Sequence, residues 1–105
     1  MKPTKQPVYL GPRTSLTPSE VTHLEAEINY TRVYSQEGKT QLLSYTMKNV
    51  HALLNKHGNF IRISHKHVVN MDFVKETSKE QLLLKNGLRL CPSRRKRKQL
   101  EYLFS

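Results

Sequence analysis

The sequence is poor in cysteine, and Cys91 is its only one. A single thiol excludes a disulfide within the chain and a cysteine-rich zinc site, which suits the reducing cytoplasm. No apolar run approaches the ~20 residues of a membrane-spanning helix, and the first residues lack the apolar core of a signal peptide. We therefore expect a cytoplasmic protein that does not span a membrane.

Acidic residues are also scarce, because 8 Asp and Glu stand against 18 Lys and Arg, for a net charge of +10. This excess favours a polyanionic partner, with nucleic acid first and an acidic membrane surface second. The alternative is a basic protein whose charge only keeps it soluble. The 105 residues suffice for one domain with a modest core.

The five histidines form no pattern typical of a metal site or a catalytic site. His65 and His67 would share one face of a strand, but Asp72 is the closest carboxylate and no third ligand is suggested. A histidine pair beside Lys66 could in principle cleave RNA by acid–base chemistry, although nothing in the spacing demands it. We expect no enzymatic activity, no bound metal and no cofactor.

The most informative stretch is residues 60–70, in which two apolar arms flank a polar centre at 64–67. The arms are rich in β-branched residues, so the pattern predicts a tight polar turn between two buried strands. Such a turn would present side chains to an anionic partner from a rigid base. An ordinary hairpin with a solvated tip fits the same spacing.

Turn residues divide the rest of the chain into short segments, which indicates a fold dominated by β-strands. A hairpin with its turn at Ile28 and Asn29 is predicted first, and Asn86-Gly87 is the strongest short hairpin signal in the chain. Residues 1–12 are expected to be a flexible or edge-strand segment. The predicted strands of the hairpins cover residues 21–27, 30–34, 40–45, 81–84 and 88–91.

Two helices are predicted. Thr46 is a suitable N-cap for the first helix, and Gly58 could end it in a left-handed conformation. Ser93 could cap a second helix that runs through Phe104. The first helix should bury one apolar stripe, which consists of Met47, Val50, Leu53 and Leu54.

Three ordered blocks of the sequence carry a resemblance to a known family. Residues 60–70 read Phe-x-Arg, polar and basic residues, an apolar pair and Asn; residues 83–95 read strand, Asn-Gly, strand and Ser-Arg; residues 25–31 include Glu-Ala and Asn-Tyr-Thr. Together they resemble the LytTR family, the DNA-binding domains of many bacterial response regulators. The resemblance covers about residues 20–104, and it implies a LytTR-type domain over 13–105.

The resemblance implies a mainly β fold, an elongated stack of small antiparallel sheets with one or two short helices. It implies sequence-specific binding of double-stranded DNA in transcription regulation, with loops and a basic helix start reading the major groove. The family typically binds repeated promoter sites as dimers, and an upstream receiver domain or a sensor kinase is a further expected partner. No membrane partner is expected.

The same resemblance implies three groups of DNA-contacting residues. Thr31 aligns with a contacting position of the family, and Arg94 aligns with the Arg of its Ser-Arg ending. Ile28 replaces a usual glycine, and Ser64-His65-Lys66 shifts the usual cation by one position. The predicted contacts are Asn29, Thr31 and Arg32 in the first block, His65 and Lys66 in the second, and Arg94, Arg95 and Arg97 in the third.

Other residues of these blocks have structural interpretations. Arg62 lies between apolar residues, so we expect it to pair with Glu25 or Glu27. Asn70 is expected to satisfy backbone groups at a bend, and Tyr30 to pack rather than contact DNA.

Two other functions remain open at this point. An RNA-binding module would show exposed aromatic residues on a sheet face, a motif that the five tyrosines do not form. A protein-interaction domain or a nuclease fragment is the other alternative.

Overall fold

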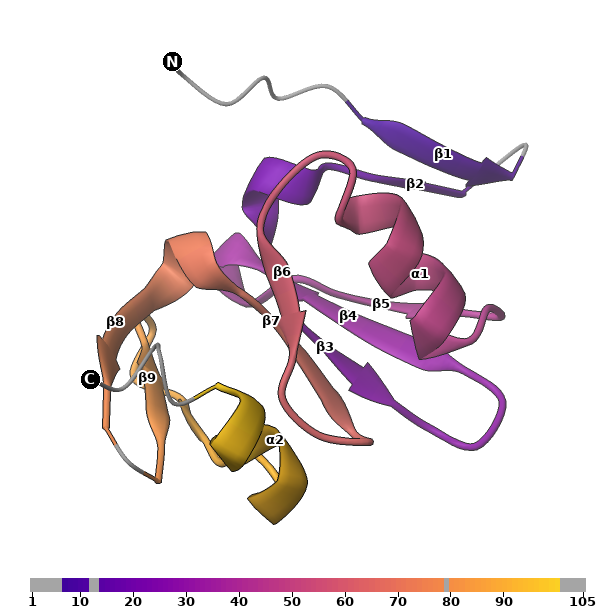
Figure 1. Cartoon of the computed structure of the whole chain (residues 1–105). Coiled ribbons are helices and arrows are strands. Elements are labelled where there is room, and N and C mark those ends of the chain that lie inside the picture. The colour runs from indigo at the N-terminus through magenta and orange to yellow at the C-terminus, as the bar shows by residue number, and fades with distance from the viewer. Residues whose placement is uncertain (1–6, 12–13, 79, 101–105) are drawn as a thin grey trace.

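The computed structural model describes residues 7–11, 14–78 and 80–100. Its strands form three small antiparallel sheets, accompanied by two short helices (Figure 1). The described part measures 41 × 34 × 23 Å along its principal axes. This arrangement confirms the predicted mainly β stack of sheets. The elements are β1 (Val8–Gly11), β2 (Thr14–Leu16), β3 (Val21–Ala26), β4 (Thr31–Ser35), β5 (Thr40–Leu43), α1 (Met47–Leu54), β6 (Phe60–Arg62), β7 (His67–Asn70), β8 (Val74–Thr77), β9 (Leu82–Leu84), β10 (Arg89–Leu90) and α2 (Arg94–Gln99).

The central sheet has five strands in the order β5-β4-β3-β7-β6. Successive residues of a strand point to opposite faces, and Val68 and Val69 of β7 accordingly enter two different cores. Val68 packs with α1 on one face, whereas Val69 packs with β9 and the residue after α2 on the other. Both faces of this sheet are therefore covered near β7.

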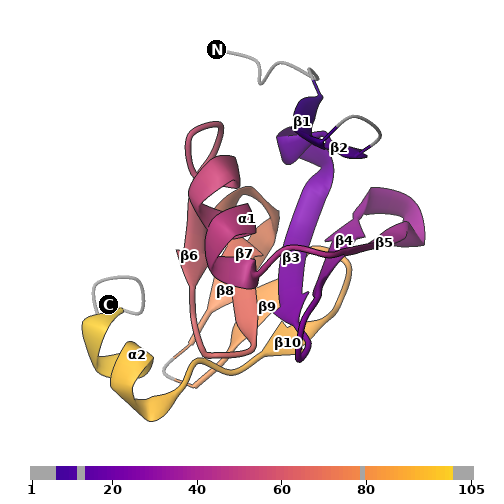
Figure 2. The same cartoon turned by 90° about the vertical axis from the view of Figure 1, so that its right-hand side faces the viewer.

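Helix α1 covers the first face of the central sheet (Figure 2). Thr46 caps it as predicted, because its hydroxyl accepts a hydrogen bond from the Asn49 N–H at 3.3 Å. The expected left-handed conformation of Gly58 is wrong: the glycines with positive φ among the described residues are Gly38 and Gly87. Gly58 instead allows a close approach, since a Cβ there would lie 3.0 Å from the Phe60 ring.

The three-stranded sheet has the order β10-β9-β8 and lies against the second face of the central sheet. Gly87 adopts a φ of 92° in the predicted Asn-Gly turn between β9 and β10. Ser93 caps α2 by accepting a hydrogen bond from the Lys96 N–H at 3.2 Å. Leu100 then enters the second core. The expected continuation of this helix to Phe104 lies outside the described residues.

The third sheet pairs β1 with β2. Leu16 belongs to the first core, and Leu10 packs against that core. The Tyr45 hydroxyl donates a hydrogen bond to the Leu10 carbonyl oxygen at 2.6 Å. Residues 8–11 thus form a docked strand, one of the two forms expected for the N-terminal segment. Neither of the described helices has the length and apolarity needed to cross a membrane.

Candidate nucleic-acid interface

Three segments that are far apart in the sequence lie along one edge of the molecule in both views (Figures 1 and 2). They are the β3–β4 turn (27–30), the β6–β7 turn (63–66) and the start of α2 (93–97), and together we call them the basic edge. Backbone hydrogen bonds fasten them: the Ala26 N–H donates to the Lys66 carbonyl at 2.7 Å, and the Ser93 N–H donates to the Ile63 carbonyl at 2.8 Å. The three segments therefore hold fixed positions relative to one another.

The β6–β7 turn is stiffened by its own side chains. The Ser64 hydroxyl accepts hydrogen bonds from the N–H groups of Lys66 (3.2 Å) and His67 (3.0 Å). Arg62 donates from Nε to the Ser64 carbonyl at 3.1 Å and from Nη2 to the His65 carbonyl at 3.2 Å. His65 and Lys66 are exposed on this turn. The structure thus gives the polar centre of residues 60–70 a rigid base.

The predicted pairing of Arg62 with an acid is wrong. Glu27 instead pairs with Arg32, and Glu25 pairs with His67, whose Nε2 lies 3.2 Å from the Glu25 carboxylate. Arg62 pairs with neither acid because the carbonyl groups of its own turn occupy its guanidinium. This side chain therefore shapes the basic edge rather than bracing the sheet.

A groove of about 370 Å³ runs between the β6–β7 turn and the start of α2. It brings together His65 and Arg95, which were predicted to contact DNA. It also includes Arg62 and Lys96, which were not among the predicted DNA contacts. Lys96 lies three residues after Ser93, which also lines the groove. Residues three apart share a helix face, so this spacing is the feature of the sequence that points to Lys96. The groove is lined by Arg62, Ser64, His65, Ser93, Arg95 and Lys96. With three cations and no carboxylate, this lining suits an anion such as a phosphate.

The other helix cations lie differently. Arg94 is exposed but does not line the groove, whereas Arg97 is half-buried. The Arg97 Nε is buried and has no hydrogen-bond partner within the described ranges. The five consecutive cations therefore do not act as one equivalent cluster.

The β3–β4 turn is a tight one. The Glu27 N–H donates to the Tyr30 carbonyl at 2.9 Å, and the Tyr30 N–H donates back at 3.4 Å. Arg32 donates from Nε and Nη2 to one oxygen of Glu27, at 3.1 and 3.0 Å. The hydrogen bond and charge of that carboxylate raise the pKa of Arg32. Asn29 is exposed at the tip, so it is the predicted residue of this segment with an unobstructed side chain.

Two predictions for this segment are wrong. Thr31 is fully buried, and its hydroxyl donates to the Tyr45 carbonyl at 2.7 Å, so its side chain does not reach a ligand on the surface. The reason is strand alternation, which turns Thr31 toward the same face as the buried Val33. Tyr30 was expected to pack, but 45% of it is exposed.

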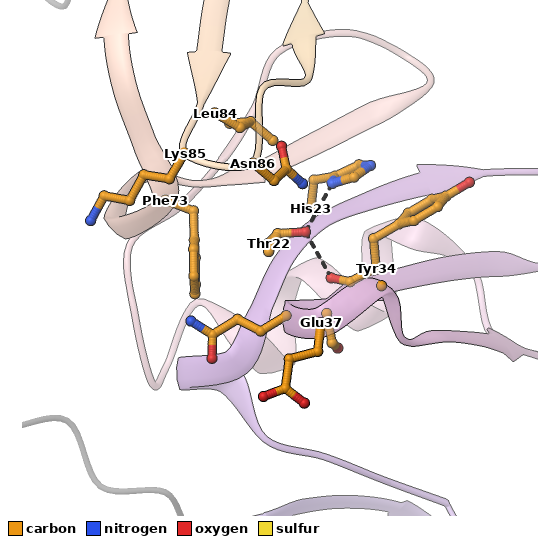
Figure 3. A pocket seen from close by; sticks show the side chains of 11 residues that line it. Thr22, His23, Tyr34, Glu37, Phe73, Leu84, Lys85 and Asn86 are labelled. Carbon is orange, nitrogen blue, oxygen red and sulfur yellow. Dashed lines mark hydrogen bonds between the residues drawn. The ribbon is translucent and has the colours of Figure 1, made fainter.

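A second cavity of about 460 Å³ lies at the opposite end of the β3–β4 hairpin from its tip (Figure 3). The Thr22 hydroxyl donates to the Tyr34 carbonyl at 3.1 Å, so the His23 Nδ1–H must donate to that hydroxyl at 3.0 Å. The end groups of Lys85 and Glu37 point away from this cavity (Figure 3). Because it lies at the far end of the hairpin from the β3–β4 turn, this cavity is separate from the basic edge.

The pKa of His23 is lowered to about 4, chiefly by burial and also by the charge of His67, while the charge of Glu25 partly opposes the shift. The His23 ring stacks on Tyr34 with centroids 4.2 Å apart. A neutral imidazole is therefore held here at pH 7. Within residues 7–11, 14–78 and 80–100, no group of three or more His, Cys, Asp or Glu side chains could hold a metal ion.

Comparison with known proteins identifies a matching family and a similar solved structure. The family model of the LytTr DNA-binding domain matches residues 13–105. A solved structure of the LytTr DNA-binding domain of a Bacillus cereus protein, described as a methyl-accepting/DNA response regulator, superimposes with a TM-score of 0.76. The two chains are 26% identical, and the match covers 95% of this chain and 97% of the other. No curated protein matches the chain.

Proposed function

The chain belongs to the LytTR family of DNA-binding domains, and from this premise we propose that it reads specific duplex sequences through its basic edge. Membership of this family implies DNA binding in transcription regulation. The observation that supports the basic edge as the contact surface is the pair of backbone hydrogen bonds from Ala26 and Ser93. They fasten three loops on one side of the molecule, where one duplex could touch all of them.

We assign the groove between the β6–β7 turn and the start of α2 to contacts with the phosphates of the DNA backbone. Arg95 and Lys96 line it together with Arg62, and Lys66 is exposed beside it. Phosphate contacts set the register and much of the affinity of a DNA-binding domain but carry no sequence information directly.

We assign base reading foremost to Arg94 and His65. Both are exposed, and neither side chain makes a hydrogen bond with the described part of the chain. An arginine fork matches the O6 and N7 acceptors of guanine in the major groove, and an imidazole can donate to or accept from a base edge. Asn29 and Arg32 would act from the β3–β4 turn, with Arg32 first leaving Glu27.

The assembly and its regulation follow the family pattern. Two copies would bind paired promoter repeats as a dimer on DNA, and an upstream receiver domain or a sensor kinase would control them. The protein would work in the bacterial cytoplasm, where its promoter DNA is located. The family is one of DNA-binding domains rather than enzymes, so a gel shift with product analysis should show intact duplex.

The RNA-binding alternative has less support. The most exposed tyrosines among the described residues are Tyr9, Tyr30 and Tyr45, which lie in β1, in the β3–β4 turn and before α1, not together on one sheet face. Competition between duplex DNA and single-stranded RNA would decide between the two.

Selection of bound sequences from random duplexes tests the assigned roles. Arg94→Ala and His65→Ala should each lose preference at particular base positions, by about 5- to 150-fold, since one good base contact discriminates by ~1–3 kcal/mol. Lys85→Ala, at the separate cavity, is the matched control and should keep the wild-type preferences. Uniform weakening at every position would mean that Arg94 and His65 touch only the backbone.

A further inference from the structure

Ile28 is the most exposed large apolar residue of the described chain, with 98% of its surface in water. It stands at the tip of the β3–β4 turn, which is part of the basic edge. Single exposed apolar residues are common on protein surfaces and need no explanation by themselves. The position of Ile28 is what requires one.

The turn itself gives no reason for an isoleucine. Tight hairpin turns favour Gly, Asn and Asp, and a β-branched residue is a poor choice there. Glu37 is the one described non-glycine residue with a positive φ, so Ile28 does not occupy the left-handed region. An almost fully exposed side chain contributes almost nothing to the core. A local rule broken without a gain in stability often marks a functional position.

The turn also prevents Ile28 from folding back onto the protein. The two Glu27–Tyr30 backbone hydrogen bonds close the turn, and the Arg32–Glu27 ion pair braces it. The Ala26 N–H, one residue before the turn, donates to the Lys66 carbonyl of the β6–β7 turn. Ile28 is thus held outward on the same edge as the cations.

We propose that Ile28 contacts the 5-methyl group of a thymine in the bound duplex, an inference that rests on the proposed function. Thymine presents the one apolar group among the base edges of the major groove, and an aliphatic side chain can recognise nothing else there. The neighbouring Asn29 is exposed and carries the amide that pairs with adenine N6 and N7. The Ile28-Asn29 tip therefore favours sites rich in A·T pairs.

Deoxyuridine provides the test, because it keeps the pairing of thymine and lacks only the methyl group. In the duplex obtained by selection, each thymine is replaced in turn, and the dissociation constant is measured for wild type, Ile28→Ala and Ile28→Val. One replacement should weaken wild type by about three- to tenfold, as expected for one buried methyl. The same replacement should leave Ile28→Ala unchanged, whereas Ile28→Val should retain most of the wild-type response.

Leu88→Ala is the matched control, since Leu88 is 38% exposed in the β9–β10 turn, outside the basic edge. It should respond to deoxyuridine as wild type does. Thermal unfolding of every variant checks that the fold is intact.

Three outcomes would overturn the inference. Deoxyuridine could weaken Ile28→Ala as much as wild type, or Ile28→Ala could bind as tightly as wild type. Weaker binding by Ile28→Ala, together with a wild type that does not respond to deoxyuridine at any position, would point to an apolar wedge between bases instead. A wild-type protein that binds no duplex would refute the proposed function, and the inference would fall with it.

Discussion

Between about 50 and about 200 mM salt, the affinity of this domain for its duplex is expected to fall roughly a thousandfold. The reason is counterion release: each phosphate that a Lys or Arg neutralises frees cations from the DNA, and added salt opposes that release. Residues 94–98 alone contribute five cations with no acid among them. About six phosphate contacts suffice for an effect of this size. Fluorescence anisotropy with a labelled duplex over a salt series measures it.

Variants assign the salt effect to the groove. Lys96→Ala removes one groove cation and should lower the slope of log affinity against log salt by about one, with equal weakening on all sequences. Lys85→Ala removes the same charge at the separate cavity and should leave the slope unchanged. An affinity that salt does not alter would contradict DNA binding through these cations.

Acidification from about pH 6.5 to about pH 4 is expected to remove about 2–3 kcal/mol from the free energy of unfolding through His23 alone. In the unfolded chain His23 takes up a proton near its ordinary pKa of 6.5, whereas in the folded protein it does so only near pH 4. Its contribution is therefore fully present above pH 6.5 and is lost as the pH falls through this window. The groups that face His23 are Thr22, Tyr34, His67 and Glu25.

Urea unfolding of wild type and His23→Gln at several pH values isolates this contribution. The stability difference between the two proteins should shrink as the pH falls, because the variant cannot be protonated there. His57→Gln, at an exposed histidine, should track wild type at every pH. Parallel stability curves for wild type and His23→Gln would show that His23 is equally easy to protonate in the folded and unfolded chains.

Sequence reasoning succeeded where a few neighbouring residues decide the structure. The Asn86-Gly87 turn and the Thr46 cap are local features, and both formed as predicted; the polar turn expected at 64–67 also formed, at 63–66, with His67 already in β7. Asn70 was expected to satisfy backbone groups, and its side-chain amide donates to the Val21 carbonyl at 2.7 Å. Its side-chain oxygen accepts from the Asp72 N–H at 3.0 Å.

The errors concern contacts that only the folded chain specifies. The alignment placed Thr31 at a contact position, but strand register turns it inward beneath the Tyr45 carbonyl. Arg62 was expected to pair with Glu25 or Glu27, but it donates hydrogen bonds to two carbonyl groups of its own turn instead. Every residue has a carbonyl group, so no pattern of side chains predicts this contact. Likewise, five consecutive cations do not reveal that Arg95 and Lys96 line the groove while Arg94 does not. That distribution depends on the angle at which α2 leaves Ser93.

Amide chemical shifts recorded while the protein is titrated with its selected duplex test most directly that three distant loops face one double helix. We predict that resonances of residues 27–30, 63–66 and 93–97 shift together and saturate at the same duplex concentration. Those of Glu37, Lys85 and Asn86 at the separate cavity should stay in place. Shifts centred on that cavity, or confined to one of the three loops, would contradict the account.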